Sequence, residues 1–213
     1  MKYKAIVMDF DGTIVDGMSA WINMYYAFDQ KYNIILSQEK KDRIYVGSVR
    51  SVATNYLSLF KHLNDHFTID SLTRYFVDNS REGTLTSPPI KGAIEFITEM
   101  HEKNIPIAIA SSSTVPTIQE FLKKHNISQC IQEIVVGSDV KHCKPAADIY
   151  IEASHRLGHD INDTVVFEDS VLALTNAKKV GFKSVLISHT KVSPESHDIQ
   201  IEDYFSPSLK ELF

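Results

Sequence analysis

The stretch "AIVMDFDGTIVDG", residues 5–17, places two aspartates, Asp9 and Asp11, one residue apart directly after an apolar run. The run is continuous in apolarity, which is typical of a strand buried on both faces of a parallel sheet. Two carboxylates at the end of such a strand repel each other, and burial disfavours both charges. A compensating group must therefore lie close to them.

Four later apolar runs resemble the first, and apolar residues recur at helical spacing between them. We expect strands at Ala5–Met8, Ile105–Ala110, Ile134–Val136, Thr164–Phe167 and Ser184–Ile187. The alternation of strand and helix predicts the α/β fold class, with a doubly wound parallel-sheet (Rossmann-like) core.

Residues 18–85 break this alternation, because the segment is rich in aromatic and polar residues and contains no convincing strand. It is far longer than an ordinary connection between elements. We therefore predict an inserted, mainly helical cap subdomain at 17–86, and an α/β catalytic core made of 1–16 and 87–213.

The bulk composition narrows the class of protein. The chain has 213 residues and a formal net charge of −5, with no run of basic residues and no apolar run long enough to span a membrane. The two cysteines form no metal or redox motif. We expect a cytoplasmic location, no nucleic-acid or membrane partner, and a monomer or weak homo-oligomer.

Polar residues follow the predicted strands at the points where they end. Ser111 and Ser112 follow the second run, Lys144 comes after the third, and Glu168 and Asp169 follow the fourth. In an open parallel sheet a ligand binds beyond the carboxyl ends of the strands. These groups should therefore meet the first pair of aspartates at one edge of the sheet.

The residue types at this edge indicate phosphoryl transfer. Asp9, Asp11 and Asp169 offer hard oxygen ligands, which suit Mg²⁺. A divalent ion would offset their mutual repulsion, while Ser111 and Lys144 offer donors to an anionic group such as phosphate. A metal, an anion cradle and a spare carboxylate together are what phosphoryl transfer requires.

In this interpretation Asp9 is the nucleophile and forms an aspartyl-phosphate. Asp11 protonates the leaving group and later activates water. Lys144 neutralises charge, and Ser111 and Ser112 bind the substrate phosphate. The alternatives are that the two aspartates only shape a turn and that Ser111 only caps a helix.

Four motifs in order resemble those of the haloacid dehalogenase-like (HAD) hydrolase superfamily. They are "DFDGT", the serine that closes "IPIAIAS", the "KP" of "CKPAADIY", and "VVFEDS". The helical insert after the first motif resembles the cap of the branch that contains phosphoglycolate phosphatases and β-phosphoglucomutases. The resemblance extends from Asp9 to Gly181.

This resemblance implies a Mg²⁺-dependent phosphatase with a phosphoaspartate intermediate, acting on a small phosphorylated metabolite. It implies that the metal is held by the side chain of Asp9, the main-chain oxygen of Asp11 and the side chain of Asp169. Glu168 is then a further ligand or an outer partner, or it only caps its helix.

Two positions bear on the subgroup. Trp21 stands where mutase-type relatives carry a histidine, whereas Arg50 stands where they have an arginine that grips the distal phosphate of the substrate. Arg50 is accordingly a candidate substrate-binding residue or a solvated side chain. The alternatives to a phosphatase are a β-phosphoglucomutase-like sugar phosphomutase, a 2-haloacid dehalogenase and a catalytically inactive phosphate-binding protein.

Overall fold

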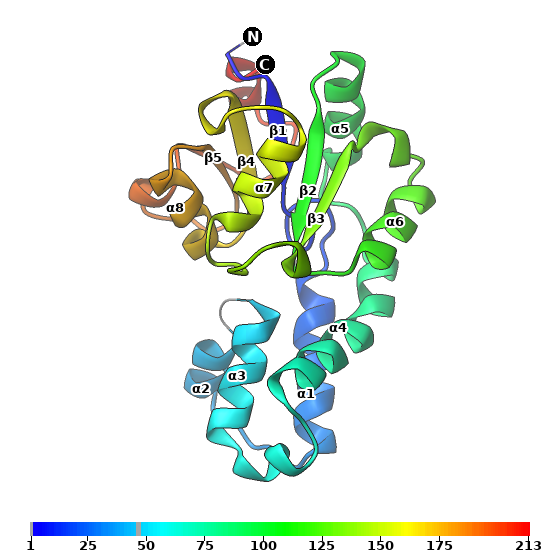
Figure 1. Ribbon diagram of the computed structural model, residues 1–213, viewed down its shortest axis with the longest axis vertical. Helices are drawn as coiled ribbons and strands as arrows, with labels where there is room; N and C mark the ends of the chain where they lie inside the picture. The colour runs from blue at the N-terminus through cyan, green and yellow to red at the C-terminus, as the bar shows by residue number, and fades with distance from the viewer. Residues whose placement is uncertain (1, 46–47) are drawn as a thin grey trace. The chain divides into compact units, whose positions relative to one another are not determined.

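Six parallel strands form one sheet in the order β3-β2-β1-β4-β5-β6 (Figure 1). The computed structural model describes residues 2–45 and 48–213. The strands are β1 (Ala5–Met8), β2 (Ile107–Ser111), β3 (Glu133–Val136), β4 (Thr164–Glu168), β5 (Lys183–Ile187) and β6 (Ile199–Ile201). The predicted fold class is confirmed, and β1 lies inside the sheet between β2 and β4.

Two expectations about the strands are wrong. The second strand begins at Ile107 rather than Ile105, because Pro106 has no amide hydrogen to donate to the ladder. The sixth strand was not expected, since its three residues alternate around Gln200 and carry no continuous apolar run. The other four predicted strands agree with the structure to within one residue at each end.

Helices cover both faces of this sheet. They are α5 (Ala93–Glu102), α6 (Val115–Lys124), α7 (Asp148–Arg156) and α8 (Val171–Lys179). Short 3-10 helices complete the connections: η2 (Ser128–Cys130), η3 (Gly137–Asp139), η4 (Ile161–Asp163), η5 (Pro194–Ser196) and η6 (Pro207–Glu211).

Alternate strand residues face opposite layers of helices. Val7 and Val166 share one buried cluster with α7 and α8. Phe167, the next residue of β4, packs instead against Phe96 of α5, with ring centroids 5.3 Å apart. Both faces of the central strands are therefore buried, as the continuous apolar runs predict.

The chain divides into two compact units, Met1–Asp16 with Pro88–Phe213, and Gly17–Ser87. The second contains α1 (Met18–Lys31), α2 (Gln38–Ile44), α3 (Val49–Leu59), η1 (Lys61–Asp65) and α4 (Ile69–Thr86). No strand occurs in the described part of this unit. Its core is aromatic, with Phe28 against Phe76 at 4.9 Å between ring centroids.

One buried carboxylate ties the helices of this second unit together. Asp29 of α1 accepts hydrogen bonds from the hydroxyls of Tyr45, at 2.8 Å, and of Tyr56 on α3, at 2.6 Å. Because a buried carboxylate is costly without partners, these two neutral donors stabilise the packing of α1 on α3.

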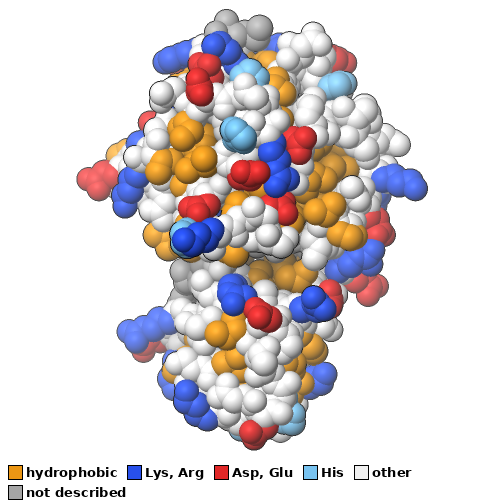
Figure 2. All heavy atoms as spheres, in the orientation of Figure 1, with side chains coloured by type: hydrophobic (Ala, Val, Ile, Leu, Met, Phe, Trp, Pro, Cys, Tyr) orange, Lys and Arg blue, Asp and Glu red, His pale blue; other side chains and the backbone are white. Residues whose placement is uncertain are grey.

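The surface carries both kinds of charge. On the face shown in Figure 2, acidic and basic side chains are interspersed over each unit, and neither kind forms a continuous patch. This mixture is typical of a solvated protein surface. Among the described helices, none has both the length and the apolarity that crossing a membrane requires.

The edge strand β6 is attached to β5 through Asp198. The carboxylate of Asp198, the residue just before β6, accepts hydrogen bonds from the amide and the hydroxyl of Ser184, each at 2.9 Å. Burial opposes the charged form, but the bonds from Ser184 and the charges of Lys183 and Lys178 outweigh it and lower the pKa of Asp198. The carboxylate is therefore more stable in the folded chain than in the unfolded one.

Asp198→Asn should destabilise the protein in a pH-dependent way. A lowered folded-state pKa contributes stability above the unfolded value of about 4, and this contribution is lost as the pH falls through the folded value. We expect a loss of about 1 kcal/mol at pH 7 and a shrinking difference from wild type below about pH 4. Urea unfolding at both pH values measures it; a difference that does not change with pH would refute the assignment.

Candidate active site

The register between β1 and β4 sets the position of the central acids. Met8 lies opposite Phe167, so the next residues, Asp9 and Glu168, lie side by side at the carboxyl end of the two strands. The Asp9 amide donates to the Phe167 carbonyl at 2.9 Å. Asp169 comes next, and one carboxylate oxygen from each of the three acids lies within 4.8 Å of the others.

Lys144 reaches these acids from the loop between η3 and α7. Its Nζ donates to Oδ1 of Asp9, and to Oε2 of Glu168 at 2.7 Å. Only 8% of Lys144 is exposed, and Asp9 and Glu168 are buried too. Charge-assisted hydrogen bonds are strong in such water-poor surroundings, so the lysine is held firmly between the two acids.

The cluster has more negative than positive charge. Burial raises the pKa of Asp9 to about 8, the charge of Glu168 adds to this effect, and Lys144 opposes it. Burial, then Glu168 and Asp9, also raise the pKa of Asp169 well above its ordinary value. Burial disfavours the ammonium of Lys144, yet the charges of Asp9 and Glu168 outweigh it and raise its pKa. One lysine therefore compensates only part of the negative charge of the three acids.

The donor set fits a hard divalent cation. Asp9, Glu168 and Asp169 offer carboxylate oxygens at a spacing that allows a metal ion to be shared. A divalent charge would supply what Lys144 leaves uncompensated. Asp11 is not part of this group of side chains in the described part of the chain. Its assignment as a ligand rests on its main-chain oxygen and stays a prediction.

A tight turn after β1 brings the backbone against Asp169. The amides of Ile14 and Val15 both donate to the carbonyl of Phe10, and Gly12 donates to Val15 at 2.7 Å. Gly12 has φ +88°, and a Cβ built on it would lie 2.3 Å from Oδ2 of Asp169. Glycine is required here both for its backbone conformation and for the space that the carboxylate occupies.

The serines at the carboxyl end of β2 lie at the same edge of the sheet. Ser111 is the last residue of β2 and its hydroxyl accepts from the Ser113 amide at 2.9 Å. The cap of α6 is Thr114, which accepts from the Thr117 amide. The alternative in which Ser111 caps this helix is therefore wrong. The assignment of Ser111 and of the half-buried Ser112 to substrate binding remains a prediction.

Glu168 also does not cap its helix. Ser170 is the cap of α8 and accepts from the Ala173 amide. Glu168 uses Oε1 to accept from the Ser170 amide, at 3.1 Å, and directs Oε2 to Lys144. Because Ser170 is the cap of α8, the alternative in which Glu168 only caps this helix is wrong.

Two tyrosines of the site were not singled out from the sequence. Tyr150 of α7 donates its hydroxyl to Oε2 of Glu168 at 2.8 Å, and Tyr204 donates to the main-chain oxygen of Thr13 at 3.1 Å. Both are buried. The only signal in the sequence was the position of Tyr150, next to Ile149 on the apolar side of its helix. Such a position usually indicates core packing alone.

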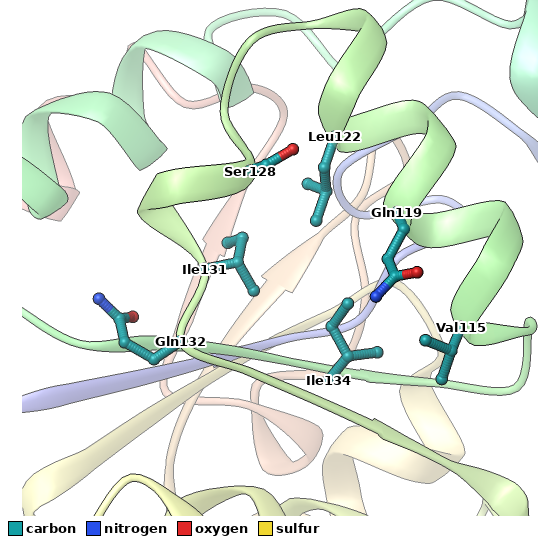
Figure 3. Close-up of a pocket in the computed structure, with 7 residues that line it drawn as sticks. All are labelled: Val115, Gln119, Leu122, Ser128, Ile131, Gln132 and Ile134. Atoms are coloured by element: carbon teal, nitrogen blue, oxygen red, sulfur yellow. The ribbon is translucent and has the colours of Figure 1, made fainter.

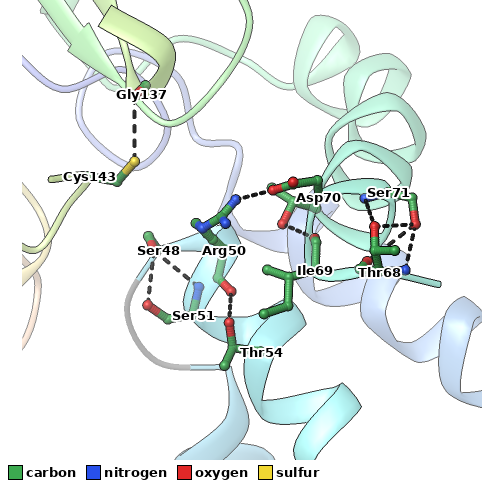
Figure 4. A network of polar contacts seen from close by, with 11 residues as sticks. Ser48, Arg50, Ser51, Thr54, Thr68, Ile69, Asp70, Ser71, Gly137 and Cys143 are labelled. Carbon is green, nitrogen blue, oxygen red and sulfur yellow. Dashed lines mark hydrogen bonds and ion pairs between the residues drawn. The ribbon is translucent and has the colours of Figure 1, made fainter. Parts of the chain in front are cut away.

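Arg50 lies on α3 of the unit Gly17–Ser87. It forms an ion pair with Asp70 of α4, and the two side chains are 51% and 80% exposed (Figure 4). Exposed pairs of this kind contribute about 0–1 kcal/mol, so Asp70 does not hold the guanidinium firmly. The assignment of Arg50 to substrate binding stays a prediction.

A separate cavity of about 350 Å³ lies between α6 and β3 (Figure 3). Its lining consists of aliphatic, amide and hydroxyl side chains: Val115, Gln119, Leu122, Ser128, Ile131, Gln132 and Ile134. It contains none of the acids described above and no cationic side chain to bind an anion. The cavity is therefore not a candidate for phosphate chemistry.

The fold and the site together define a class of protein, the α/β enzymes that carry buried carboxylates and a lysine at the carboxyl ends of parallel strands. A family model described as haloacid dehalogenase-like hydrolase matches residues 6–187 of the chain. The chain belongs to this family. The predicted resemblance to this superfamily is confirmed, and the enzyme class is hydrolase.

Individual relatives are distant in sequence. A phosphorylated carbohydrates phosphatase from Thermotoga maritima is 24% identical over 188 residues, which cover 85% of this chain and 83% of that protein. A longer protein, the bifunctional riboflavin kinase/FMN phosphatase of Arabidopsis thaliana, is 32% identical over 99 residues. These cover 46% of this chain and 26% of that protein.

Solved structures show the same fold. The crystal structure of β-phosphoglucomutase from Clostridium difficile superimposes with a TM-score of 0.78 at 15% identity, covering 98% of this chain and 96% of that one. A magnesium-bound HAD-hydrolase, YfnB from Bacillus subtilis, gives 0.72 at 16% identity, covering 100% and 99%. At such identities the likeness concerns the fold alone.

Gly12→Ala should disable the site. The added methyl group would have to displace the carboxylate of Asp169, because its Cβ would lie 2.3 Å from Oδ2. We expect a loss of activity of at least about 100-fold, since misplacing a reacting group by an ångström has that effect. Steady-state kinetics with a phosphomonoester measures the loss.

Gly158→Ala is the matched control. Gly158 also has a positive φ, +75°, but nothing lies within 4 Å of its Cβ position. The control should lose roughly 1 kcal/mol of stability through backbone strain and keep its activity. Equal activity losses in the two variants would mean that backbone strain, rather than contact with Asp169, explains the glycine at position 12.

Proposed function

We propose that this chain is a Mg²⁺-dependent phosphatase that hydrolyses a small phosphorylated metabolite through an aspartyl-phosphate on Asp9. The observation that carries the proposal is the buried cluster in which Lys144 bridges Asp9 and Glu168 while Asp169 remains uncompensated. Such a cluster is stable in its charged form only with a further cation. The phosphatase relatives support the choice of phosphomonoesters as substrates.

The residues that would hold Mg²⁺ are Asp9 and Asp169 through their side chains and Asp11 through its main-chain oxygen. When bound, the ion supplies positive charge to the carboxylates and to the phosphoryl oxygens. It also allows two anions, nucleophile and substrate, to approach each other. Carboxylate oxygens are the ligands that this ion prefers.

In the first step a carboxylate oxygen of Asp9 attacks the phosphorus of the monoester. The bond from phosphorus to the ester oxygen breaks, and protonated Asp11 gives its proton to the departing alcohol. The spacing of two residues, with the turn at Gly12 directly after Asp11, allows the second aspartate to serve the leaving group rather than the nucleophile.

In the second step Asp11 takes a proton from water, and the resulting hydroxide oxygen attacks the same phosphorus. The bond from phosphorus to the Asp9 oxygen breaks and inorganic phosphate is released, which restores both aspartates. Burial disfavours the ammonium of Lys144, but the charges of Asp9 and Glu168 outweigh it and raise its pKa, which favours the protonated form. The role of Lys144 is to stabilise negative charge on the nucleophile and on the phosphoryl oxygens.

We assign the phosphate-binding donors to Ser111 and Ser112, and the substrate-selecting role to the helical unit Gly17–Ser87. This unit is the proposed cap of a catalytic core made of 1–16 and 88–213. A lid that excludes bulk water protects an acyl-phosphate from side reactions and strengthens the electrostatic contacts around it. Arg50 is the proposed contact to a second anionic group of the substrate.

A sugar phosphomutase is the second candidate. It uses the same nucleophile but returns the phosphoryl group to a sugar hydroxyl instead of to water. The presence of Arg50 favours it, whereas the named phosphatase relatives favour hydrolysis. A mutase would be activated by a sugar bisphosphate and would hydrolyse simple monoesters slowly.

Asp9→Asn should abolish turnover on a panel of phosphomonoesters with Mg²⁺. The amide is a poor nucleophile, so we expect kcat/KM to fall about 10⁴-fold or more. Phosphate release measures the loss. EDTA should stop the wild-type reaction, because the acids lose their counterion; a chain that stays active on 2-haloacids without metal would be a dehalogenase instead.

Asp163→Asn is the matched control for this change. Asp163 pairs with Lys4 at 2.8 Å beside the amino end of β4, at the opposite edge of the sheet from the site. It should keep wild-type turnover. Undiminished hydrolysis by the Asp9 variant would contradict the covalent mechanism, and no turnover by wild type on the whole panel would favour an inactive phosphate-binding protein.

A further inference from the structure

Glu168 has nearly all of its hydrogen-bonding capacity occupied by protein donors. Oε2 accepts from Nζ of Lys144 at 2.7 Å and from the hydroxyl of Tyr150 at 2.8 Å, while Oε1 accepts from the Ser170 amide at 3.1 Å. A carboxylate oxygen has about two lone-pair sites, so Oε2 is saturated. The residue is 2% exposed, and its contacts are therefore made within the protein.

Tyr150 completes this arrangement from the side of α7. It is fully buried, and its hydroxyl has Glu168 as acceptor. Burial, with the charge of Glu168, raises the pKa of Tyr150 well above its ordinary value, so the hydroxyl stays a donor. The ammonium of Lys144 lies 5.0 Å from the centroid of the same ring. The tyrosine thus contacts both members of the pair.

We propose that Tyr150 is a positioning residue that keeps Oε2 of Glu168 turned toward Lys144, so that Glu168 orients the lysine. The inference rests on the proposed function, because it concerns the nucleophile assigned there. It gives Glu168 the role of aiming the Lys144 ammonium at Asp9.

The proposal has a consequence that a purely structural role of Tyr150 does not have. Without the hydroxyl, one lone-pair site of Oε2 becomes free, and the carboxylate of Glu168 can turn away from Lys144. Lys144 then loses its fixed orientation, whereas the carboxylates that would hold the cation remain. Metal binding should therefore be retained while catalysis becomes slower.

The test is Tyr150→Phe, which keeps the ring and removes only the hydroxyl. Calorimetric titration with Mg²⁺ in the absence of substrate should give a dissociation constant equal to that of wild type. We expect kcat to fall by about tenfold to a hundredfold, which is the rate effect of losing one hydrogen bond to a charged group. The KM for a phosphomonoester should change less than about threefold. Weaker Mg²⁺ binding, or an unchanged kcat, would overturn the inference.

A double-mutant cycle with Glu168→Gln tests whether Tyr150 acts through Glu168. The double variant should be no slower than Glu168→Gln alone, because the tyrosine has then lost its charged acceptor. Independent, multiplying losses in kcat would contradict the proposal.

Tyr56→Phe is the matched control for loss of a buried tyrosine hydroxyl. Tyr56 donates to the carboxylate of Asp29 at 2.6 Å, within the unit Gly17–Ser87. This variant should unfold at a lower temperature and bind Mg²⁺ as wild type does. If wild type turns over no phosphomonoester, the proposed function fails, while the Mg²⁺ titrations of wild type and Tyr150→Phe still decide the inference. Absence of Mg²⁺ binding to wild type overturns both.

Discussion

The contact of Lys144 with Asp9 and Glu168 is the interaction on which the rest of the site depends. Burying two carboxylates beside a third, Asp169, would be prohibitive without positive charge, and one ammonium covers only part of it. Burial, together with the charge of Glu168, raises the pKa of Asp9 to about 8, and Lys144 only partly opposes this effect. A further cation would favour the ionised form of this nucleophile, and this links the electrostatics of the cluster to its proposed chemistry.

The strand register of the sheet places the acids that make this contact. The parallel register that sets Met8 against Phe167 makes Asp9 and Glu168 neighbours without any long loop. The turn at Gly12 then brings the backbone close to Asp169. The carboxylate of Asp169 occupies the space that a side chain at position 12 would need. Two ordinary backbone features thus place all three acids, and only Lys144 has to reach the site from outside the central strands.

Much of this was predictable from the sequence because continuous apolar runs mark buried parallel strands. Residues that follow such runs must meet at the carboxyl ends of the parallel strands. The sequence alone therefore predicts that Asp9, Lys144, Glu168 and Asp169 lie together. The β6 strand could not be predicted, since a three-residue edge strand has too little periodicity. Tyr150 was also missed, because an aromatic residue on the inner side of a helix looks the same whether it only packs or also donates a hydrogen bond.

We propose that a divalent cation completes the buried acid cluster. The most direct test is calorimetric titration of the wild-type protein and of Asp169→Asn with Mg²⁺. We predict binding at one site in wild type and an affinity at least about tenfold lower in the variant, since one ligand and one charge are lost. Equal affinities in the two proteins, or no binding to either, would contradict it.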